Sequence, residues 1–271
     1  MLLQFSHGNG FPAGCYRAFF KALEVLAPAI TIRAVERIGH DSRFPITDKW
    51  PHLVEELVER IDSRDAALGP LVLAGHSLGG YLSLMAAYAR PHAVSAVLLL
   101  DSPIVPRWKA TMLALAKKTG LDEHISPAGM TKTRRNHWPD RAAAHAHFRA
   151  KSLFEAFDPA ALNDYLDAGL VHSASGAKLA FERERETLIY RTLPHHLHGV
   201  TRQPPPCPVG FIGGTRSTEL RMAGTAATRR FVGPHFRMIK GGHLFTMERP
   251  RAAAEAAVAM LAELGVLPRV A

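Results

Sequence analysis

The amino-acid sequence predicts an α/β fold, built on a mostly parallel sheet of about six strands flanked by helices. Short apolar runs typical of buried strands alternate with segments of helical periodicity, which is the pattern of parallel strands joined by crossover helices. The length of 271 residues suits one domain with an insertion rather than several independent domains. The expected strands are Leu2–Ser6, Ala29–Val35, Pro70–Ala74, Val94–Leu100, Val209–Ile212 and Phe236–Ile239.

Two helices of the main domain are predicted by their residue patterns. Apolar side chains recur at three- and four-residue steps from position 50 to 68, and Asp48 is placed to cap the helix that they indicate. A second helix is expected from Pro250 to about Leu264, because proline suits a first turn and the alanines that follow favour helix. This last helix is expected to close the domain.

The stretch between the fourth and fifth strands shows helical patterning and no convincing strand. We therefore expect a helical cap at 103–202, with the α/β core formed by 1–102 and 203–271. Its predicted helices are Lys109–Thr119, Arg141–Phe157 and Ala160–Ala168. Its aromatic side chains are expected to pack the cap, and those that face the site would line an acyl pocket; they are Trp108, Trp138, Phe148, Phe154, Phe157 and Tyr165.

Composition excludes several classes of protein. The formal charge of +9 could attract anions, but lysines and arginines are scattered among acids, so we expect no nucleic-acid partner. No apolar run reaches membrane-spanning length and the N-terminus lacks a secretory pattern, so we expect a cytoplasmic protein without a membrane partner. Cys15 and Cys207 are expected to stay reduced there. The partner expected is a small-molecule substrate, and the sequence leaves the oligomeric state open.

The strongest chemical signal is the run Gly75-His76-Ser77-Leu78-Gly79, which follows an apolar strand and opens a helix. A strand-to-helix turn this tight excludes side chains at both glycines and exposes the serine hydroxyl. The motif predicts Ser77 as a nucleophile. His76 beside it is either a structural residue or part of the substrate-binding site.

A second signal is His7-Gly8-Asn9-Gly10-Phe11, directly after the first strand. Attack by a serine on a carbonyl creates an oxyanion, which two preorganised amides must stabilise. The amides of Leu78 and Asn9 are the natural donors. Gly8 and Gly10 let the backbone approach a substrate, Phe11 completes this substrate-binding segment, and His7 is expected to brace the loop by hydrogen bonding.

A third signal is the turn Gly241-Gly242-His243 after the last strand. A general base must reach the nucleophile from a loop at the carboxyl edge of the sheet. Of the fifteen histidines, His243 alone follows the last strand in such a turn, whereas His235 precedes that strand. We therefore predict His243 as the base.

In this order, the three motifs resemble those of the α/β-hydrolase superfamily over nearly the whole chain. The resemblance implies the α/β-hydrolase fold, with a helical cap inserted after the sixth family strand, here Val94–Leu100. Segments of the cap resemble a subgroup of bacterial and fungal α/β-hydrolases, a similarity that assigns no substrate; they are Arg134-Arg135, Trp138-Pro139, His147-Phe148-Arg149, Phe157-Asp158-Pro159 and Tyr165 through Gly169-Leu170.

The acid that would complete a catalytic triad with Ser77 and His243 departs from the family pattern. Family members usually carry Asp after the strand that is here Val209–Ile212, but Ser217 stands in its place. Asp101, at the end of the preceding strand, and Glu219, slightly beyond the usual site, are both candidates, and we favour Asp101. Either carboxylate could instead have a local role, in a turn or at a helix N-terminus.

The N-terminus is a second departure, because the chain begins on the strand before the oxyanion loop without the usual antiparallel hairpin. Either the sheet lacks an edge or the recorded start is internal. The histidines His195, His196 and His198 have no cysteine or carboxylate at a matching interval, so we expect no metal. The charged run Glu182–Glu186 is expected to be a solvated helix face, from which Glu186 could turn inward toward a cap arginine.

The function hypothesis that follows is a serine hydrolase that cleaves an ester-like bond of a small, partly apolar substrate through an acyl-enzyme, with no cofactor. An acyltransferase or a carbon–carbon bond hydrolase would use the same groups. A ligand-binding protein that kept the fold and lost catalysis is the alternative of another class, suggested by the missing aspartate.

Overall fold

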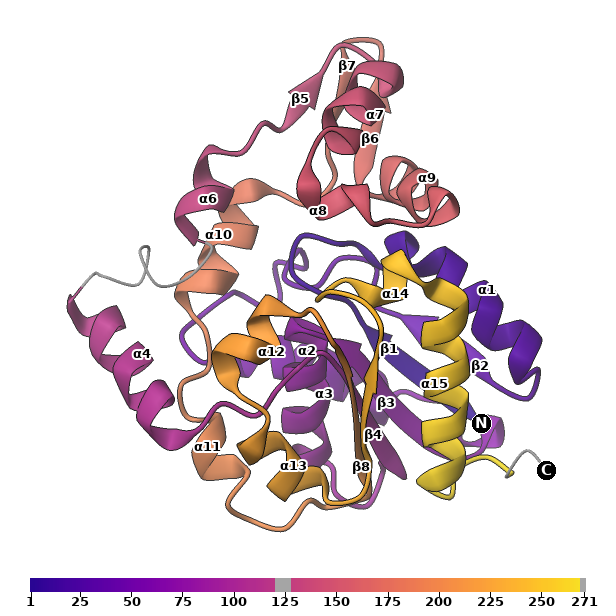
Figure 1. Ribbon diagram of the computed structural model, residues 1–271. Coiled ribbons are helices and arrows are strands. Elements are labelled where there is room, and N and C mark those ends of the chain that lie inside the picture. The colour runs from indigo at the N-terminus through magenta and orange to yellow at the C-terminus, as the bar shows by residue number, and fades with distance from the viewer. Residues whose placement is uncertain (120–127, 269–271) are drawn as a thin grey trace.

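Six parallel strands form the main sheet in the computed structural model, which describes residues 1–119 and 128–268. Their order across the sheet is β2-β1-β3-β4-β8-β9 (Figure 1). The bounds are β1 (Leu2–Ser6), β2 (Thr31–Ala34), β3 (Leu71–His76), β4 (Ala96–Leu100), β8 (Val209–Gly214) and β9 (Phe236–Ile239). The predicted strands and the α/β fold class are thereby confirmed.

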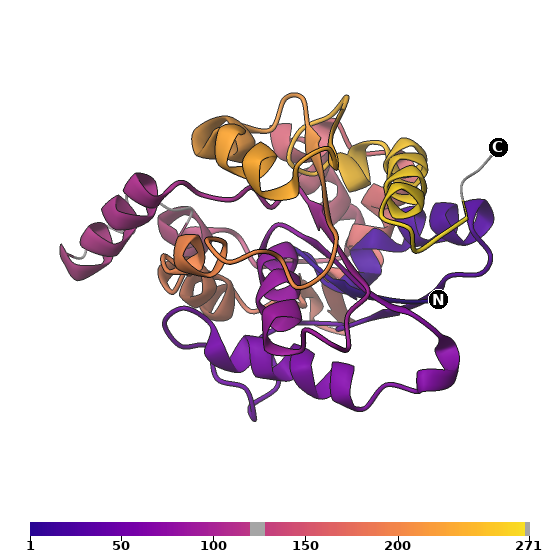
Figure 2. The same cartoon turned by 90° about the horizontal axis from the view of Figure 1, so that it is seen from below.

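Helices cover both faces of this sheet, and strand residues alternate between the two cores. Leu3 and Phe5 of β1 belong to the core beneath α1 (Arg17–Leu26) and α15 (Pro250–Glu263), which lie side by side (Figure 1). Leu2 and its equivalents on other strands face α2 (Pro51–Asp62) and α3 (Leu78–Ala89) instead. Figure 2 shows the sheet between these two helical layers. Burial on both faces explains why the strands are almost continuously apolar.

The remaining elements of the core are short. They are the 3-10 turns η1 (Ala13–Tyr16) and η2 (Ala66–Leu68), and the helices α12 (Thr218–Ala223), α13 (Ala226–Val232) and α14 (Phe245–Glu248).

The expected helix over 50–68 is shorter than predicted, and its predicted cap is wrong. Trp50 occupies the N-cap with φ of 63°, and the Asp48 carboxylate instead pairs with Lys117 of α4. Hydrophobic periodicity locates the buried face of a helix, but it does not specify the local hydrogen bonds at its end. The C-terminal helix, by contrast, is confirmed.

The segment between β4 and β8 holds helices and also a small sheet, so the prediction that it contains no strand is wrong. Three antiparallel strands lie in the order β5-β7-β6. The strands are β5 (His137–Trp138), β6 (Leu170–Ser173) and β7 (Gly176–Leu179). They are two to four residues long and partly exposed, so no apolar run marked them.

Two of the three helices predicted in this segment are found whole, as α4 (Arg107–Thr119) and α9 (Pro159–Ala168). The expected helix Arg141–Phe157 is divided into α7 (Arg141–Arg149) and α8 (Ser152–Glu155). The charged run Glu182–Glu186 leads into α10 (Arg183–Arg191), and the short helices α6 (Ala128–Thr133) and α11 (Leu197–Val200) were not predicted. In Figure 1 the small sheet and α7–α9 form an upper lobe, while α4 extends to the left.

Aromatic side chains fill the interior of this lobe. Five of the six that were predicted to pack the cap are buried. Trp138, Phe148, Phe154, Phe157 and Tyr165 are buried and join the same core as α1 and α15. Trp108 on α4 is 61% exposed, so its predicted packing role is wrong. Within the described ranges, no helix is both long and apolar enough to cross a lipid bilayer.

Candidate active site

Ser77 occupies the sharp turn between β3 and α3, with φ of 52°. A Cβ at Gly75 would lie 2.2 Å from the carbonyl carbon of Gly79, and a Cβ at Gly79 would lie 1.9 Å from the carbonyl oxygen of Ser6. Both glycines are therefore required by contact with other backbone, as the sequence motif predicted. The left-handed backbone conformation of Ser77 is strain stored at the turn.

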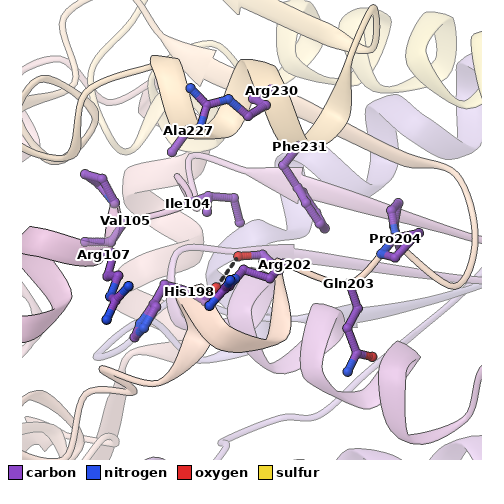
Figure 3. Close-up of a pocket in the computed structure, with 13 residues that line it drawn as sticks. Ile104, Val105, Arg107, His198, Arg202, Gln203, Pro204, Ala227, Arg230 and Phe231 are labelled. Atoms are coloured by element: carbon purple, nitrogen blue, oxygen red, sulfur yellow. Dashed lines mark hydrogen bonds between the residues drawn. The ribbon is translucent and has the colours of Figure 1, made fainter.

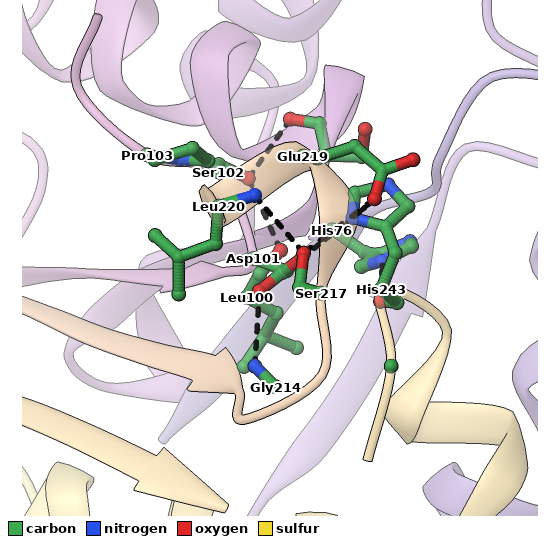
Figure 4. A network of polar contacts seen from close by, with 12 residues as sticks. His76, Leu100, Asp101, Ser102, Pro103, Gly214, Ser217, Glu219, Leu220 and His243 are labelled. Carbon is green, nitrogen blue, oxygen red and sulfur yellow. Dashed lines mark hydrogen bonds and ion pairs between the residues drawn. The ribbon is translucent and has the colours of Figure 1, made fainter. Parts of the chain in front are cut away.

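The backbone of Ser77 is held by the neighbouring strand β4. Its amide donates to the Leu100 carbonyl at 3.0 Å, and the Ser102 hydroxyl donates to its carbonyl at 2.9 Å (Figure 4). Ser102 fits against Gly80, where a Cβ would lie only 2.1 Å from the hydroxyl oxygen. Nothing in the sequence motif pointed to Ser102, because its partner is a backbone carbonyl.

His243 lies in the turn after β9, and its Nδ1 donates to Asp101 Oδ2 at 2.6 Å (Figure 4). Asp101 is only 1% exposed and also has a positive φ, of 47°. The Gly214 amide donates to its other oxygen at 3.0 Å. Because an ionised carboxylate only accepts, these contacts fix the proton of His243 on Nδ1 and leave Nε2 as the acceptor.

Ser217, found where the family aspartate was expected, contacts the Asp101 carboxylate directly. Its hydroxyl donates to Asp101 Oδ2 at 2.5 Å. The Ser217 Oγ also accepts a hydrogen bond from the Leu220 amide and thereby caps α12. Glu219 lies farther from the imidazole, with its Oε2 3.7 Å from His243 Nδ1, and its side chain is 50% exposed. Of the two candidate acids, Asp101 alone is within hydrogen-bond distance of His243.

Burial lowers the pKa of His243, but the hydrogen bond to Asp101 and the charges of Glu219 and Asp101 outweigh it, so the pKa is raised overall. His76 shows the opposite balance. It is fully buried without a carboxylate partner, and its pKa is lowered to about 3. One imidazole is thus electrostatically favoured to accept a proton, and its neighbour stays neutral.

His76 binds protein groups through both ring nitrogens. Its Nδ1 lies 2.8 Å from the Tyr16 hydroxyl, and its Nε2 lies 2.9 Å from the carbonyl oxygen of His243. The two imidazole rings are 4.8 Å apart between centroids. The residue next to Ser77 therefore contacts the loop that carries His243. Tyr16 could not be predicted as part of the site, because no sequence motif marks it.

The loop after β1 is braced by His7, as expected. The Ile38 amide donates to His7 Nε2 at 2.7 Å, and His7 Nδ1 donates to the Gly8 carbonyl at 2.8 Å. Burial lowers the pKa of His7 to about 4, which keeps the ring neutral in this arrangement. The Gly8 carbonyl belongs to the same peptide plane as the Asn9 N–H, so His7 fixes the direction of that amide.

Side chains of the inserted segment lie against this loop. Gly10 has φ of 80°, and a Cβ there would lie 2.5 Å from Glu186 Oε1. The Asn9 side-chain amide donates to the Glu186 carbonyl at 3.0 Å. Glu186 turns inward and pairs with Arg134 at 2.9 Å, as considered from the sequence, and burial raises its pKa. Phe11 packs against Tyr165, with 5.5 Å between ring centroids.

The only potential metal-binding cluster found among the described residues is the site itself. Ligand atoms of Asp101, Glu219 and His243 lie within 4.8 Å of one another. A metal there would have to displace the proton shared by His243 and Asp101, so the hydrogen-bonded arrangement and a metal exclude each other.

A separate hollow of about 570 Å³ lies among α4, α11, α13 and the loop that contains Pro204 and Pro205 (Figure 3). Its apolar lining includes Ile104 and Phe231, and its polar lining includes Arg107, Arg202 and Arg230. None of the predicted site residues lines it. The hollow is therefore distinct from the Ser77 site.

Curated proteins resemble part of the chain. Monoglyceride lipase of Rattus norvegicus is 30% identical over 126 residues, which are 43% of this chain and 40% of that protein. Lipase LipV of Mycobacterium tuberculosis is 37% identical over 79 residues, which are 28% of this chain and 29% of that protein. The chain thus spans less than half the length of these relatives.

Solved structures resemble the whole chain. E-2-(acetamidomethylene)succinate hydrolase has a TM-score of 0.72 at 18% identity and covers 96% of this chain and 91% of its own. The peroxisomal alpha-beta-hydrolase Lpx1 of Saccharomyces cerevisiae has a TM-score of 0.71 at 16% identity and covers 100% of this chain and 79% of its own. The model of the alpha/beta hydrolase family matches residues 5–256. Because this match covers nearly the whole chain, the protein belongs to the alpha/beta hydrolase family.

Proposed function

We propose that this protein is a serine hydrolase that cleaves ester bonds through an acyl-enzyme, with Ser77 as nucleophile, His243 as base and Asp101 as acid. The observation that carries the proposal is the 2.6 Å hydrogen bond from His243 to the buried Asp101, beside a strained turn that presents Ser77. The lipases among its relatives support an ester substrate.

In the proposed reaction, the Ser77 hydroxyl gives its proton to His243 Nε2 as its oxygen attacks the carbonyl carbon. The carbonyl oxygen becomes an oxyanion, stabilised by the amides of Asn9 and Leu78. The Leu78 amide is available because it begins α3 and has no partner one turn earlier in the helix. When this tetrahedral intermediate collapses, the bond to the alcohol oxygen breaks, and the leaving alcohol takes the proton from His243.

Water then attacks the acyl-enzyme with the same assistance and releases the acid. The Asp101 carboxylate stabilises the protonated imidazole without taking its proton. With Asp101 in place, the serine at position 217 no longer favours an inactive ligand-binding protein, because its hydroxyl supports the acid.

We assign substrate contact to the backbone of Gly8 and Gly10 and to the Phe11 ring, beneath a cap formed by 103–202. Phe11 and the cap aromatic Tyr165 supply an apolar wall, which suits a small, partly apolar acyl group. His76 belongs to this site as a positioning residue, because its ring nitrogens are both bonded within the protein.

Ser77→Ala tests the proposal. The variant is expected to lose turnover of p-nitrophenyl acetate and butyrate by at least about 10⁴-fold, because the covalent step is removed. It should also lose labelling by a fluorophosphonate probe. Ser95→Ala, at an exposed serine before β4, is the matched control and should keep both signals. A Ser77→Ala protein that retains either signal would refute the mechanism.

A further inference from the structure

Two backbone groups of the site are connected by a chain of hydrogen bonds through two buried side chains, and the proposed reaction itself does not use this chain. The Gly8 amide donates to the Tyr16 hydroxyl at 2.9 Å. Tyr16 and His76 Nδ1 are 2.8 Å apart, and His76 Nε2 is 2.9 Å from the His243 carbonyl oxygen. The chain therefore runs from the oxyanion loop to the loop that carries the base. Tyr16 is 1% exposed and His76 is fully buried.

The two ends of this chain determine the direction of every bond in it. A backbone N–H only donates, so the Tyr16 oxygen accepts from Gly8 and its own proton is free to go to His76 Nδ1. A carbonyl oxygen only accepts, so His76 Nε2 must carry a proton and donate it in the hydrogen bond to the backbone carbonyl of His243. Tyr16 and His76 thus have one consistent arrangement of protons, with the Nε2–H tautomer of His76.

We propose that Tyr16 and His76 are positioning residues that hold the oxyanion loop and the His243 loop in register on either side of Ser77. The inference rests on the proposed function. His76 precedes Ser77 directly, so the chain crosses the site at the nucleophile. An oxyanion amide misplaced relative to the base would lower kcat, because both must act in one transition state.

Steric and electrostatic features keep the chain intact. A Cβ at Gly8 would lie 2.7 Å from His76 Nδ1 and 3.1 Å from the Tyr16 oxygen, so only glycine leaves room for the bonds. Burial raises the pKa of Tyr16 well above its ordinary value and lowers that of His76. Both groups stay uncharged, so the chain does not compete with His243 for the proton of Ser77.

The first test is kinetic and uses Tyr16→Phe, which removes one oxygen and keeps the ring. We expect kcat for p-nitrophenyl butyrate to fall about tenfold with KM within about twofold, a smaller loss than the 10²–10³ typical of a deleted oxyanion donor. Tyr88→Phe is the matched control and should match wild type, since its hydroxyl binds the Gln203 carbonyl on the far side of α3. A Tyr16→Phe protein with unchanged kcat overturns the inference.

A double-mutant cycle separates positioning from general loss of stability. His76→Gln keeps an N–H near Nε2 and removes the Nδ1 acceptor, so it breaks the same link as Tyr16→Phe. The double variant should be within about twofold of the worse single variant, whereas independent effects would multiply to about a hundredfold. Multiplicative losses would overturn the shared role.

A readout on the wild-type protein needs neither folding of a variant nor turnover. Nitrogen-15 NMR of labelled histidines should show His76 protonated at Nε2 and unprotonated at Nδ1, and the opposite tautomer overturns the chain. If wild type neither hydrolyses esters nor reacts with the fluorophosphonate, the proposed function fails, and the tautomer result shows separately whether the chain exists.

Discussion

At the scale of single residues, the proposed acid Asp101 shows what a motif can and cannot predict. The sequence offered a single candidate each for the nucleophile and the base, Ser77 and His243, because both stand in local patterns of strand, turn and glycine. Two candidates for the acid stayed open, because the carboxylate at the end of β4 lies next to His243 only once the strands pair in the sheet. Ser217 completes this arrangement with a contact of 2.5 Å to Asp101, a pairing 116 residues apart that no local pattern records.

The contact between positions 101 and 217 predicts that the acid can be moved. Asp101→Ser should lose about 10⁴-fold in kcat, the loss typical of an altered triad acid. The double variant with Ser217→Asp returns a carboxylate to the same hydrogen-bonding position and is expected to recover at least about tenfold of that loss. Esterase kinetics check this, and a double variant no better than Asp101→Ser would contradict the geometry.

Glu219 is expected to tune His243 rather than to replace the acid. Its charge helps to raise the pKa of His243, and the base must be neutral to act. Glu219→Gln should therefore move the acidic limb of the pH profile of kcat/KM to lower pH, with the plateau within about threefold of wild type. If the plateau falls as far as in Asp101→Asn, Glu219 is the acid after all.

At the scale of elements, long buried patterns were predictable and short exposed ones were not. The six main strands are apolar along their whole length because both faces are covered, and each was predicted. The strands β5, β6 and β7 have only two to four residues each and mix apolar with polar side chains, so no apolar run marks them in the sequence. The break between α7 and α8 was missed because the apolar pattern continues across it.

The turn from β3 into α3 predicts a sharp difference between two glycine substitutions. Gly79→Ala would force a methyl group into the Ser6 carbonyl and should destabilise the fold by at least about 3 kcal/mol. Gly199→Ala on α11 meets no atom within 4 Å and should leave stability within about 1 kcal/mol. Urea unfolding compares the two variants, and equal midpoints would contradict the close contact between Gly79 and the Ser6 carbonyl.

At the scale of the whole molecule, the buried imidazoles link folding to pH. His7 and His76 have pKa values lowered to about 4 and 3, against 6.5 when exposed. Below pH 6.5 the unfolded chain binds protons that the folded chain does not, so their contribution to stability is present above 6.5 and is lost as pH falls. Each of these two histidines lowers the unfolding free energy by up to about 1.4 kcal/mol for each pH unit of acidification.

Buried carboxyls such as Glu186, whose pKa is raised, change the unfolding free energy with pH in the opposite direction. The contribution of one histidine is therefore measured as the difference between wild type and a variant that lacks it. His76→Gln cannot titrate, so its unfolding free energy should fall less steeply than that of wild type between pH 6.5 and 4.5. Urea titrations at several pH values give both slopes. Parallel slopes would show that His76 is not buried as a neutral ring.

The proposed nucleophile and acid stand at the ends of the adjacent strands β3 and β4. The Ser77 amide donates to the Leu100 carbonyl of β4, and the Asp101 amide donates to the Ile212 carbonyl of β8. Their spacing is thus a property of the sheet rather than of surface loops. On heating, the gap between hydroxyl and carboxylate should persist until the sheet melts. Esterase activity and the β-sheet circular dichroism signal would then disappear together, and cooling would restore both or neither.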